Sequence, residues 1–255
     1  MAIGVLIIGD EILSGKRQDK HMARLIGALG ERGLALAWCE YLGDDPALIT
    51  SVLARTFSGE AAVFSFGGIG ATPDDHTRAC AARAAGVPLA LHPEAEQEIR
   101  ARFGADVTPQ RLMMGEFPQG SAVIPNPYNR IPGFSLRRHY FLPGFPEMAW
   151  PMMEWVLDTH YRALFDPSRT AEASIIVRGA GESQLIELMK QTVARFPALK
   201  IFSLPRLAPD RHIELGARGN PAEVAAAIAA IEEGVTALGF EWMRAEPPAR
   251  RPAKV

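Results

Sequence analysis

Hydrophobic positions in the first part of the chain follow two periods. Ile3–Ile8 and Ala61–Phe66 are short continuous apolar runs, which are typical of strands buried on both faces of a sheet. After Asp19, apolar residues recur three and four positions apart, as on one face of an amphipathic helix, and Leu34–Leu42 has the pattern of another strand. Strands that alternate with helices predict a mostly parallel sheet covered by helices on both faces, that is, a three-layer α/β domain.

Two residue pairs that contain proline mark expected helix starts. Asp45-Pro46 has the order of an N-cap followed by the first helical residue, and Thr72-Pro73 repeats it, which predicts a helix from there to about Ala85. The stretch 88–150 is less regular. Its expected elements are strands at Leu89–Leu91, Ala122–Ile124 and His139–Leu142, helices at 93–103, 108–115 and 145–158, and a loop with three prolines at 125–133.

The pattern changes at about residue 170. A strand at Glu172–Arg178, a helix, strands at Leu199–Leu204 and near 213–217, and a last helix capped by Asn220-Pro221 predict a small two-layer domain of β-α-β-β-α order. The end of the chain is rich in proline and basic residues, which predicts disorder. The expected organisation is a three-layer domain at 1–165, a small domain at 170–243 and a disordered tail at 244–255.

Composition narrows the class of protein. Lys and Arg total 27 against 29 Asp and Glu, and 48% of the residues are hydrophobic, which excludes wholesale disorder and argues against nucleic-acid binding through bulk positive charge. The first apolar run has no basic segment before it and ends at Gly9-Asp10-Glu11, so it is neither a signal peptide nor a membrane span. Cys39 and Cys80 form no CxxC motif and are expected to be buried in a reducing compartment. The sequence therefore predicts a soluble cytoplasmic protein.

The strongest chemical signal is the segment Gly67–Thr72, called the glycine loop below, which lies between a predicted strand and a predicted helix. Glycines let backbone N–H groups approach a ligand closely, and a helix N-terminus favours negative charge, so a phosphate site is expected. The loop matches neither the Walker motif nor GxGxxG. Asp74 and Asp75 would lie in the first helical turn, where simple capping would also account for them. Because two carboxylates would repel a phosphate, a divalent cation between them is the consistent interpretation.

Acidic residues also follow the other two predicted strands of this region. Asp10 and Glu11 come after the first strand, and Asp44 comes after the second. Helix capping explains Asp45 but leaves Asp44 without a structural role. Solvated loop acids are the alternative for each loop alone, yet three acidic loops at neighbouring strand ends together predict a site. His21 is expected at the surface or at an edge rather than as a ligand.

The segments GDEILSG, GDDP, GGIGATPDDHT and LPGFPEM carry a family resemblance. Over roughly residues 1–160, and in this order, they resemble the molybdopterin-binding family, which includes the molybdenum-cofactor biosynthesis proteins of MogA and MoaB type and the N-terminal domain of CinA, the competence-damage protein. Residues 170–240 resemble the small α/β domain that follows it in CinA-type proteins. A third CinA domain, an amidase of nicotinamide nucleotides, is not expected in this chain.

The resemblance implies binding of molybdopterin or of a nucleotide diphosphate at the strand ends. In the biosynthetic relatives, two aspartates that the motifs place at Asp44 and Asp75 serve the transfer of adenylate to the pterin phosphate. Other CinA-type relatives cleave the pyrophosphate of ADP-ribose or FAD with a divalent metal. Relatives form trimers and dimers, so a homo-oligomer is expected. Phe66 replaces a usual Thr or Ser and is expected in the core, Ala71 replaces a usual Pro, and the small domain lacks the GxxG clamp of RNA-binding domains.

Three functional hypotheses remain open. The first is a protein that binds a pterin phosphate or nucleotide diphosphate. The second is a pyrophosphatase that depends on Mg²⁺, Mn²⁺ or Co²⁺, in which Asp75 holds the metal and Asp44 orients the attacking water or acts as general base. The third is a non-catalytic scaffold that assembles through the small domain; none of the three involves a nucleic-acid or membrane partner. The ligand-binding residues expected under the first two hypotheses are Asp10, Glu11, Ser14, Gly15, Gly67, Gly68, Gly70, Thr72, Asp74, Pro143 and Gly144.

Overall fold

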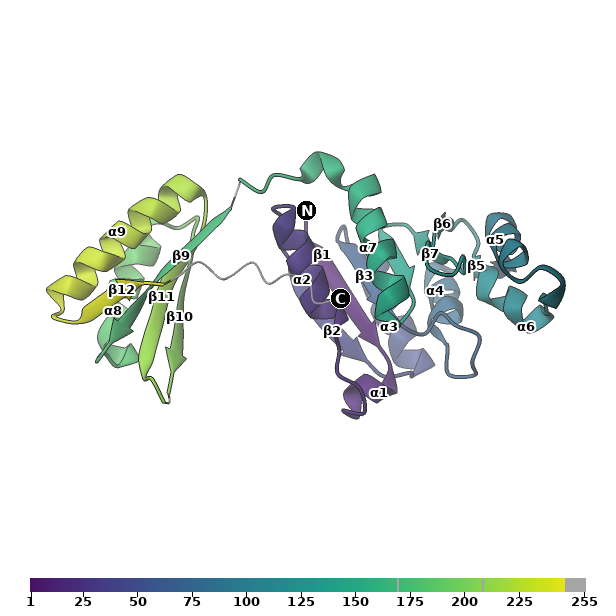
Figure 1. The fold of residues 1–255 in the computed structure, drawn as a ribbon, viewed down its shortest axis with the longest axis horizontal. Helices are drawn as coiled ribbons and strands as arrows, with labels where there is room; N and C mark the ends of the chain where they lie inside the picture. Colours follow the sequence, from purple (N-terminus) through teal and green to yellow (C-terminus); the bar gives the residue numbers. More distant parts are fainter. Residues whose placement is uncertain (169, 208, 246–255) are drawn as a thin grey trace. The chain divides into compact units, whose positions relative to one another are not determined.

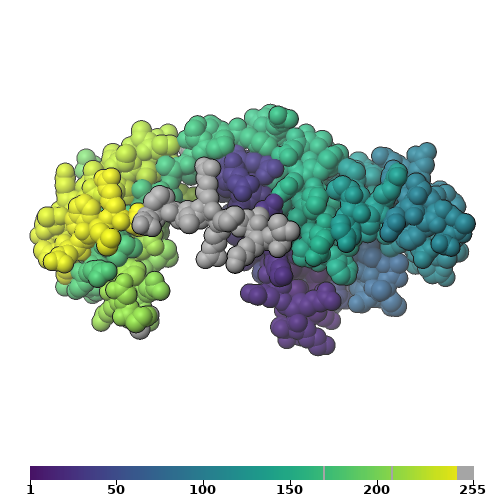
Figure 2. All heavy atoms as spheres, in the orientation of Figure 1, coloured from purple at the N-terminus to yellow at the C-terminus, as the bar shows by residue number. Residues whose placement is uncertain are grey.

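The structure, a computed structural model, describes residues 1–168, 170–207 and 209–245. The chain divides into two compact units, Met1–Phe165 and Asp166–Val255 (Figure 1). Side chains fill the space between the ribbons within each unit (Figure 2). Of the tail expected at 244–255, Arg244 belongs to a strand and residues 246–255 lie outside the described residues. Among the helices of the described ranges, none is long and apolar enough to cross a membrane.

A six-stranded sheet forms the centre of the first unit. In spatial order its strands are β2 (Trp38–Leu42), β1 (Ile3–Ile8), β3 (Ala62–Phe66), β8 (His139–Leu142), β7 (Gly133–Leu136) and β6 (Ala122–Ile124). The first four strands run parallel, and β7 and β6 continue the sheet in antiparallel pairing. The mostly parallel α/β sheet expected from the sequence is therefore confirmed.

Helices cover both faces of this sheet. They are α2 (His21–Glu31) and α7 (Pro146–His160) on one face, and α3 (Pro46–Phe57) and α4 (Thr77–Ala85) on the other (Figure 1). Successive side chains of a strand point to opposite faces, so Val5 and Ile7 of β1 pack in the core with α2 and α7. Leu6 and Ile8 pack in the second core with α3 and α4. A strand buried on both faces needs an apolar residue at every position, which explains the continuous run in the sequence.

The chain between α4 and β6 forms a small excursion from the sheet. Its strands β4 (Leu89–Leu91) and β5 (Glu116–Pro118) pair antiparallel with each other. Between them lie α5 (Pro93–Phe103) and α6 (Pro109–Leu112), and two three-residue 3-10 turns follow these helices, at Gly104–Asp106 and Met113–Gly115. The expected helix at 108–115 is therefore α6 followed by a 3-10 turn.

In its described residues, the second unit is an antiparallel sheet with two helices. In spatial order its strands are β10 (Lys200–Arg206), β11 (His212–Gly219), β9 (Ala171–Arg178) and β12 (Glu241–Arg244), and its helices are α8 (Glu182–Arg195) and α9 (Pro221–Ala237). The Asn220 side chain caps α9 by accepting hydrogen bonds from two backbone N–H groups, as the sequence predicts. The sequence pattern did not indicate β12.

Three expectations from the sequence are corrected. Helix α4 begins at Thr77 rather than at Thr72-Pro73, so Asp74 and Asp75 precede the helix instead of lying in its first turn. The segment 125–133 is not entirely loop, because Gly133 begins β7. Cys39 is only partly buried, whereas Cys80 is buried as expected.

Candidate functional site

The candidate site lies where β1 and its two neighbours end. Strand β2 lies next to β1 on one side within the sheet, and β3 lies next to β1 on the other. The loops that follow β1 and β3 therefore diverge and leave a crevice at the carboxyl ends of the strands, the usual ligand position in open α/β sheets. The short helix α1 (Asp10–Leu13) follows β1 there. A pocket of about 400 Å³ opens at this point, which is within the range of small-molecule sites.

The glycine loop forms the floor of the pocket, and two of its residues must be glycine. Gly67 has φ +104°, and a Cβ there would lie 2.1 Å from the carbonyl oxygen of Ile8. Gly68 has φ +69°, and a Cβ there would lie 2.3 Å from Oγ1 of Thr77. Both values are in the left-handed region that side chains disfavour. The backbone can therefore pass close to β1 and to the start of α4 only without side chains.

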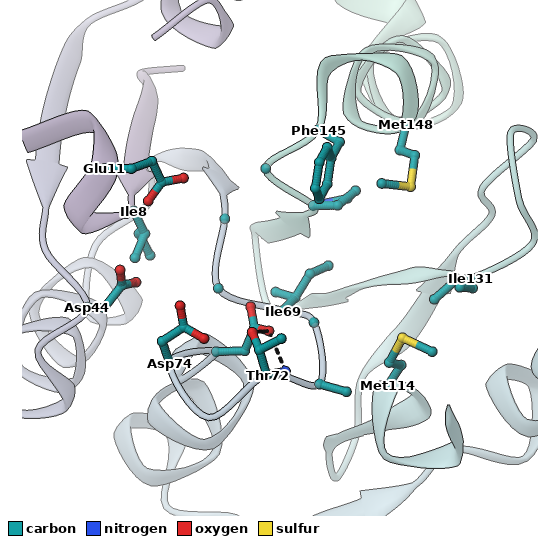
Figure 3. A pocket seen from close by; sticks show the side chains of 18 of the residues that line it. Ile8, Glu11, Asp44, Ile69, Thr72, Asp74, Met114, Ile131, Phe145 and Met148 are labelled. Carbon is teal, nitrogen blue, oxygen red and sulfur yellow. Dashed lines mark hydrogen bonds between the residues drawn. The ribbon is translucent and has the colours of Figure 1, made fainter. Parts of the chain in front are cut away.

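One side of the pocket is acidic. Figure 3 shows Glu11, Asp44 and Asp74 together on this side. The backbone N–H of Asp10 donates to Oδ2 of Asp44 at 2.8 Å, and the N–H of Asp44 donates to Oδ1 of Asp10 at 3.1 Å. This reciprocal pair joins the loops after β1 and β2, so Asp44 does have a structural role, contrary to the expectation from the sequence.

The surroundings of this side raise the pKa of the Asp44 carboxyl. Its partial burial raises the pKa of the Asp44 carboxyl, and the nearby charges of Asp10, Glu11 and Asp74 raise it further, while the hydrogen bond from the Asp10 backbone opposes them. A carboxylate with a raised pKa is a better proton acceptor than an ordinary one. This property suits the general base assumed in the second hypothesis.

Asp75 is held by the glycine loop rather than by the helix. Its Oδ2 accepts hydrogen bonds from the backbone N–H of Thr72 at 2.8 Å and from Oγ1 of Thr72 at 2.5 Å. The backbone N–H of Asp75 donates to the carbonyl oxygen of Thr72 at 3.0 Å, which closes a turn. These bonds fix the carboxylate beside the loop and explain why the helix starts later than the Thr72-Pro73 pair suggests.

The opposite side of the pocket is apolar and was not foreseen from the sequence. Figure 3 shows Met114, Ile131, Phe145 and Met148 on this side, and the Phe145 side chain is 54% exposed. These residues come from three segments that are distant in sequence. The one local signal was the 125–133 loop, in which asparagines stand among prolines and beside an isoleucine.

Two asparagines of that loop form a fixed amide pair at the pocket. Oδ1 of Asn129 accepts hydrogen bonds from Nδ2 of Asn126 at 2.8 Å and from the backbone N–H of Ile131 at 2.9 Å. Because a backbone N–H can only donate, the orientation of the Asn129 amide is determined. Its Nδ2 has Met148 Sδ, at 3.0 Å, as its one acceptor among the described residues, and a thioether is a weak acceptor. Asn129 thus offers the pocket a hydrogen-bond donor.

Most of the residues expected at the site line this pocket. Asp10 and Ser14 instead line an adjoining depression together with Glu11, Asp44 and Asp74, and the exposed Gly15 lines neither. The expected residues that line the pocket are Glu11, Asp44, Gly67, Gly68, Gly70, Thr72, Asp74, Asp75, Pro143 and Gly144. Outside the glycine loop, the lining residues that sequence reasoning missed are Ile8, Gly9, Arg17, Met114, Asn126, Asn129, Ile131, Pro132, Phe145 and Met148.

His21 and Phe66 lie behind the pocket wall. Phe66 is buried in the core, as expected, and stacks on the His21 ring with centroids 4.5 Å apart. His21 is buried rather than at the surface, which corrects the prediction, and its Nε2 makes a 3.0 Å hydrogen bond to the Gly144 carbonyl oxygen. Burial lowers the pKa of His21. Nε2 therefore carries the proton that supports this part of the wall, and Nδ1 has no hydrogen-bond partner within the described ranges.

The donors at the pocket fit a hard divalent cation only in part. The carboxylates of Glu11, Asp44 and Asp74 supply oxygen, which such cations prefer. The described residues nevertheless contain no group of three or more His, Cys, Asp or Glu side chains placed to hold a metal by themselves. Mg²⁺ commonly uses one or two carboxylates together with phosphate oxygens and water. The residues therefore suit a cation that arrives with a phosphorylated ligand.

Comparisons with known proteins agree with this fold. The family model described as "Probable molybdopterin binding domain" matches residues 4–162. A CinA-like protein of Myxococcus xanthus is 31% identical over 245 residues, which are 91% of this chain and 58% of that protein. A CinA-like protein of Geobacter metallireducens is 33% identical over 72% of this chain and 47% of its own length. This chain thus spans about half the length of these curated relatives.

A solved structure is also similar to part of this chain. The CinA protein of Thermoplasma acidophilum, whose function is given as unknown, matches with a TM-score of 0.57 and 26% identity over 62% of this chain and 98% of its own. The family model covers the glycine loop and every residue that lines the pocket. The resemblance inferred from the four sequence segments is confirmed: this chain belongs to the family of probable molybdopterin-binding domains, and its curated relatives include CinA-like proteins.

Proposed function

We propose that the pocket binds a phosphorylated heterocycle, either a pterin phosphate of the molybdopterin type or a nucleotide diphosphate. The observation that carries this proposal is the division of one pocket into three surfaces. The glycine loop offers backbone N–H groups to phosphate, the acidic side offers oxygens to a cation, and the apolar side offers Phe145 and two methionines to a flat ring. A sugar phosphate or a free anion would leave the apolar side without a partner.

The charge balance supports a cation as part of the ligand complex. Four carboxylates line the pocket, those of Glu11, Asp44, Asp74 and Asp75, and Arg17 is the cationic side chain among the described lining residues. Bound Mg²⁺, Mn²⁺ or Co²⁺ would screen these carboxylates from a phosphate and polarise it. Asp75 is the proposed protein ligand of this cation, because the bonds from Thr72 occupy only Oδ2.

One observation favours a second candidate function, a metal-dependent pyrophosphatase. The raised pKa of Asp44 suits a general base, and Asp44 lies on the same side of the pocket as Glu11 and Asp74. In this reaction a water molecule would lose a proton to Asp44 and attack one phosphorus of a pyrophosphate. The products would be two phosphomonoesters, which are AMP and ribose 5-phosphate when the substrate is ADP-ribose.

Two measurements on the purified chain test these functions. Calorimetric titration with ADP-ribose and with a pterin phosphate, in the presence of Mg²⁺, Mn²⁺ or Co²⁺, tests binding, and the release of AMP from ADP-ribose or FAD tests hydrolysis. Asp75→Asn keeps an oxygen for the Thr72 hydrogen bonds but removes the charge, so it should abolish the effect of the metal. Asp106→Asn, an exposed residue outside the pocket, is the matched control.

The outcomes separate the hypotheses. Binding with AMP release that Asp75→Asn abolishes supports the pyrophosphatase, and binding without AMP release supports a binding or cofactor-assembly role. If the wild-type chain binds neither class of ligand with any of the metals, both proposals are wrong and only the scaffold remains.

A further inference from the structure

Arg78 is a buried cation in the first turn of α4. The residue is 5% exposed, and its guanidinium forms no ion pair with a carboxylate among the described residues. It donates instead to three backbone carbonyl oxygens: to Gly70 at 2.6 Å, to Glu116 at 3.3 Å, and to Met113. Arginine is rarely buried without a charged partner, because desolvation of the guanidinium costs free energy.

The three carbonyls belong to two different sides of the pocket. Gly70 is part of the glycine loop. Met113 and Glu116 lie before and after Met114, whose side chain lines the apolar side of the pocket. Arg78 itself does not line the pocket. The buried Arg78 side chain thus connects the glycine loop to the segment around Met114 on the apolar side of the pocket.

The carbonyl contacts also determine the direction of the loop N–H groups. The carbonyl oxygen of Gly67 accepts from Oγ1 of Thr77 at 3.1 Å, and that of Gly68 accepts from the backbone N–H of Thr77 at 2.9 Å. Together with Gly70, three carbonyls of the loop are held at the start of α4. In a trans peptide the C=O and the following N–H point in opposite directions. The N–H groups that follow these carbonyls therefore point away from α4; they belong to Gly68, Ile69 and Ala71.

These N–H groups are free to bind a ligand. None of the four consecutive N–H groups from Gly68 to Ala71 has a hydrogen-bond acceptor within the described ranges. Unpaired backbone donors are rare, and successive ones that converge form anion-binding concavities. A guanidinium behind the loop adds a positive charge that no carboxylate bond neutralises, although Asp75 and Glu116 lie near enough to interact with it.

We propose that Arg78 is a positioning residue that turns the N–H groups of the glycine loop toward a bound phosphate and holds the loop against the segment around Met114. The ligand class in this inference rests on the proposed function. Arg78 does not touch the ligand; it acts through the Gly70 carbonyl. A ligand phosphate would then be bound by backbone donors, and the carboxylates would serve the cation.

The test uses two substitutions of Arg78 and a matched control on the same helix. Arg78→Lys keeps the charge but replaces the planar fork by a compact ammonium that cannot reproduce the three contacts, and Arg78→Met removes both. Arg83→Lys makes the same chemical change at an exposed position of α4. Pyrophosphate with Mg²⁺ is the probe, measured by calorimetry and by the ¹⁵N–¹H shifts of the amides from Gly68 to Ala71.

The expected result is a loss that is specific for the anion. An N–H that no longer points at an anion costs about tenfold in affinity, so Arg78→Lys should weaken pyrophosphate binding at least about fivefold and Arg78→Met more. The pyrophosphate-induced shifts of the loop amides should shrink in both variants, and Arg83→Lys should behave as the wild type. If Arg78→Met does not fold, Arg78→Lys alone decides.

Two outcomes would overturn the inference in distinguishable ways. In the first outcome, the wild type binds pyrophosphate, and Arg78→Lys binds it with the same affinity and the same amide shifts. This outcome would refute the role of Arg78 and leave the proposed function intact. No pyrophosphate or nucleotide binding by the wild type would refute both.

Discussion

The buried His139 makes the stability of the first unit depend on pH in a calculable way. His139 is 1% exposed, at the start of β8, and its Nε2 makes a 2.8 Å hydrogen bond with Oγ1 of Thr56. Burial, with a smaller contribution from the charge of Arg137, lowers the pKa of His139 from 6.5 to about 4. The folded chain therefore keeps the imidazole neutral at a pH at which the unfolded chain protonates it.

The sign and size follow from this difference. Because the unfolded state binds the extra proton, the stabilising effect is complete above pH 6.5 and is lost as the pH falls toward 4. One pKa unit corresponds to about 1.4 kcal/mol, so the full effect is about 3 kcal/mol, of which about 2 kcal/mol is already lost at pH 5. His21, whose pKa is also lowered by burial, adds a loss of the same sign.

Urea unfolding at pH 7 and at pH 5 measures this effect. Trp242 belongs to the second unit, so Trp242→Phe leaves tryptophan fluorescence as a probe of the first unit alone. In this background, His139→Gln removes the titration, and the exposed His160→Gln is the control. The parent should lose about 2 kcal/mol more than His139→Gln between the two pH values. Equal losses in the parent and His139→Gln would refute the argument.

Three further predictions concern the pocket. Gly67→Ala should abolish ligand binding and destabilise the fold by at least about 1 kcal/mol in urea unfolding, because the new Cβ would lie 2.1 Å from the Ile8 carbonyl oxygen at a φ of +104°. Phe145→Ala should weaken ADP-ribose binding about fivefold or more through lost ring stacking but leave pyrophosphate affinity unchanged in calorimetry, and an equal loss for both would contradict a ring-binding role. Asp74→Asn should lower the pKa of Asp44 in a ¹³C NMR titration of its carboxyl carbon, since one of the charges that raise it is removed; an unchanged pKa would show that the charge of Asp74 does not act on Asp44.

The parts of the fold and site that could be predicted depend on local sequence. Asp45 accepts hydrogen bonds from the N–H groups of Ala47 and Leu48, as its place before Pro46 indicated. The acidic and glycine-rich sides of the pocket were also predictable. The carboxyl ends of parallel strands meet at one edge of the sheet, so residues that follow such strands meet as well.

Other features depend on contacts that the local pattern does not contain. Thr72-Pro73 has the sequence of a helix start, but Asp75 bonds back to Thr72 and closes a turn before the helix can begin. The place of His21 in the first turn of a helix indicated a position at the surface or at an edge, whereas the structure buries His21 against Phe66. The apolar wall of the pocket combines segments that are up to 34 positions apart, from Met114 to Met148, and no periodicity links them.

The division of the chain at Phe165 has a consequence for the evolution of the domain arrangement. Every residue that lines the pocket lies between Ile8 and Met148, in the first unit. A gene segment that encodes this unit therefore carries the whole pocket, and recombination at the division would exchange the second unit without altering one lining residue. The pocket and the domain that follows it can thus evolve separately, and the first unit can be fused to another domain without loss of the pocket.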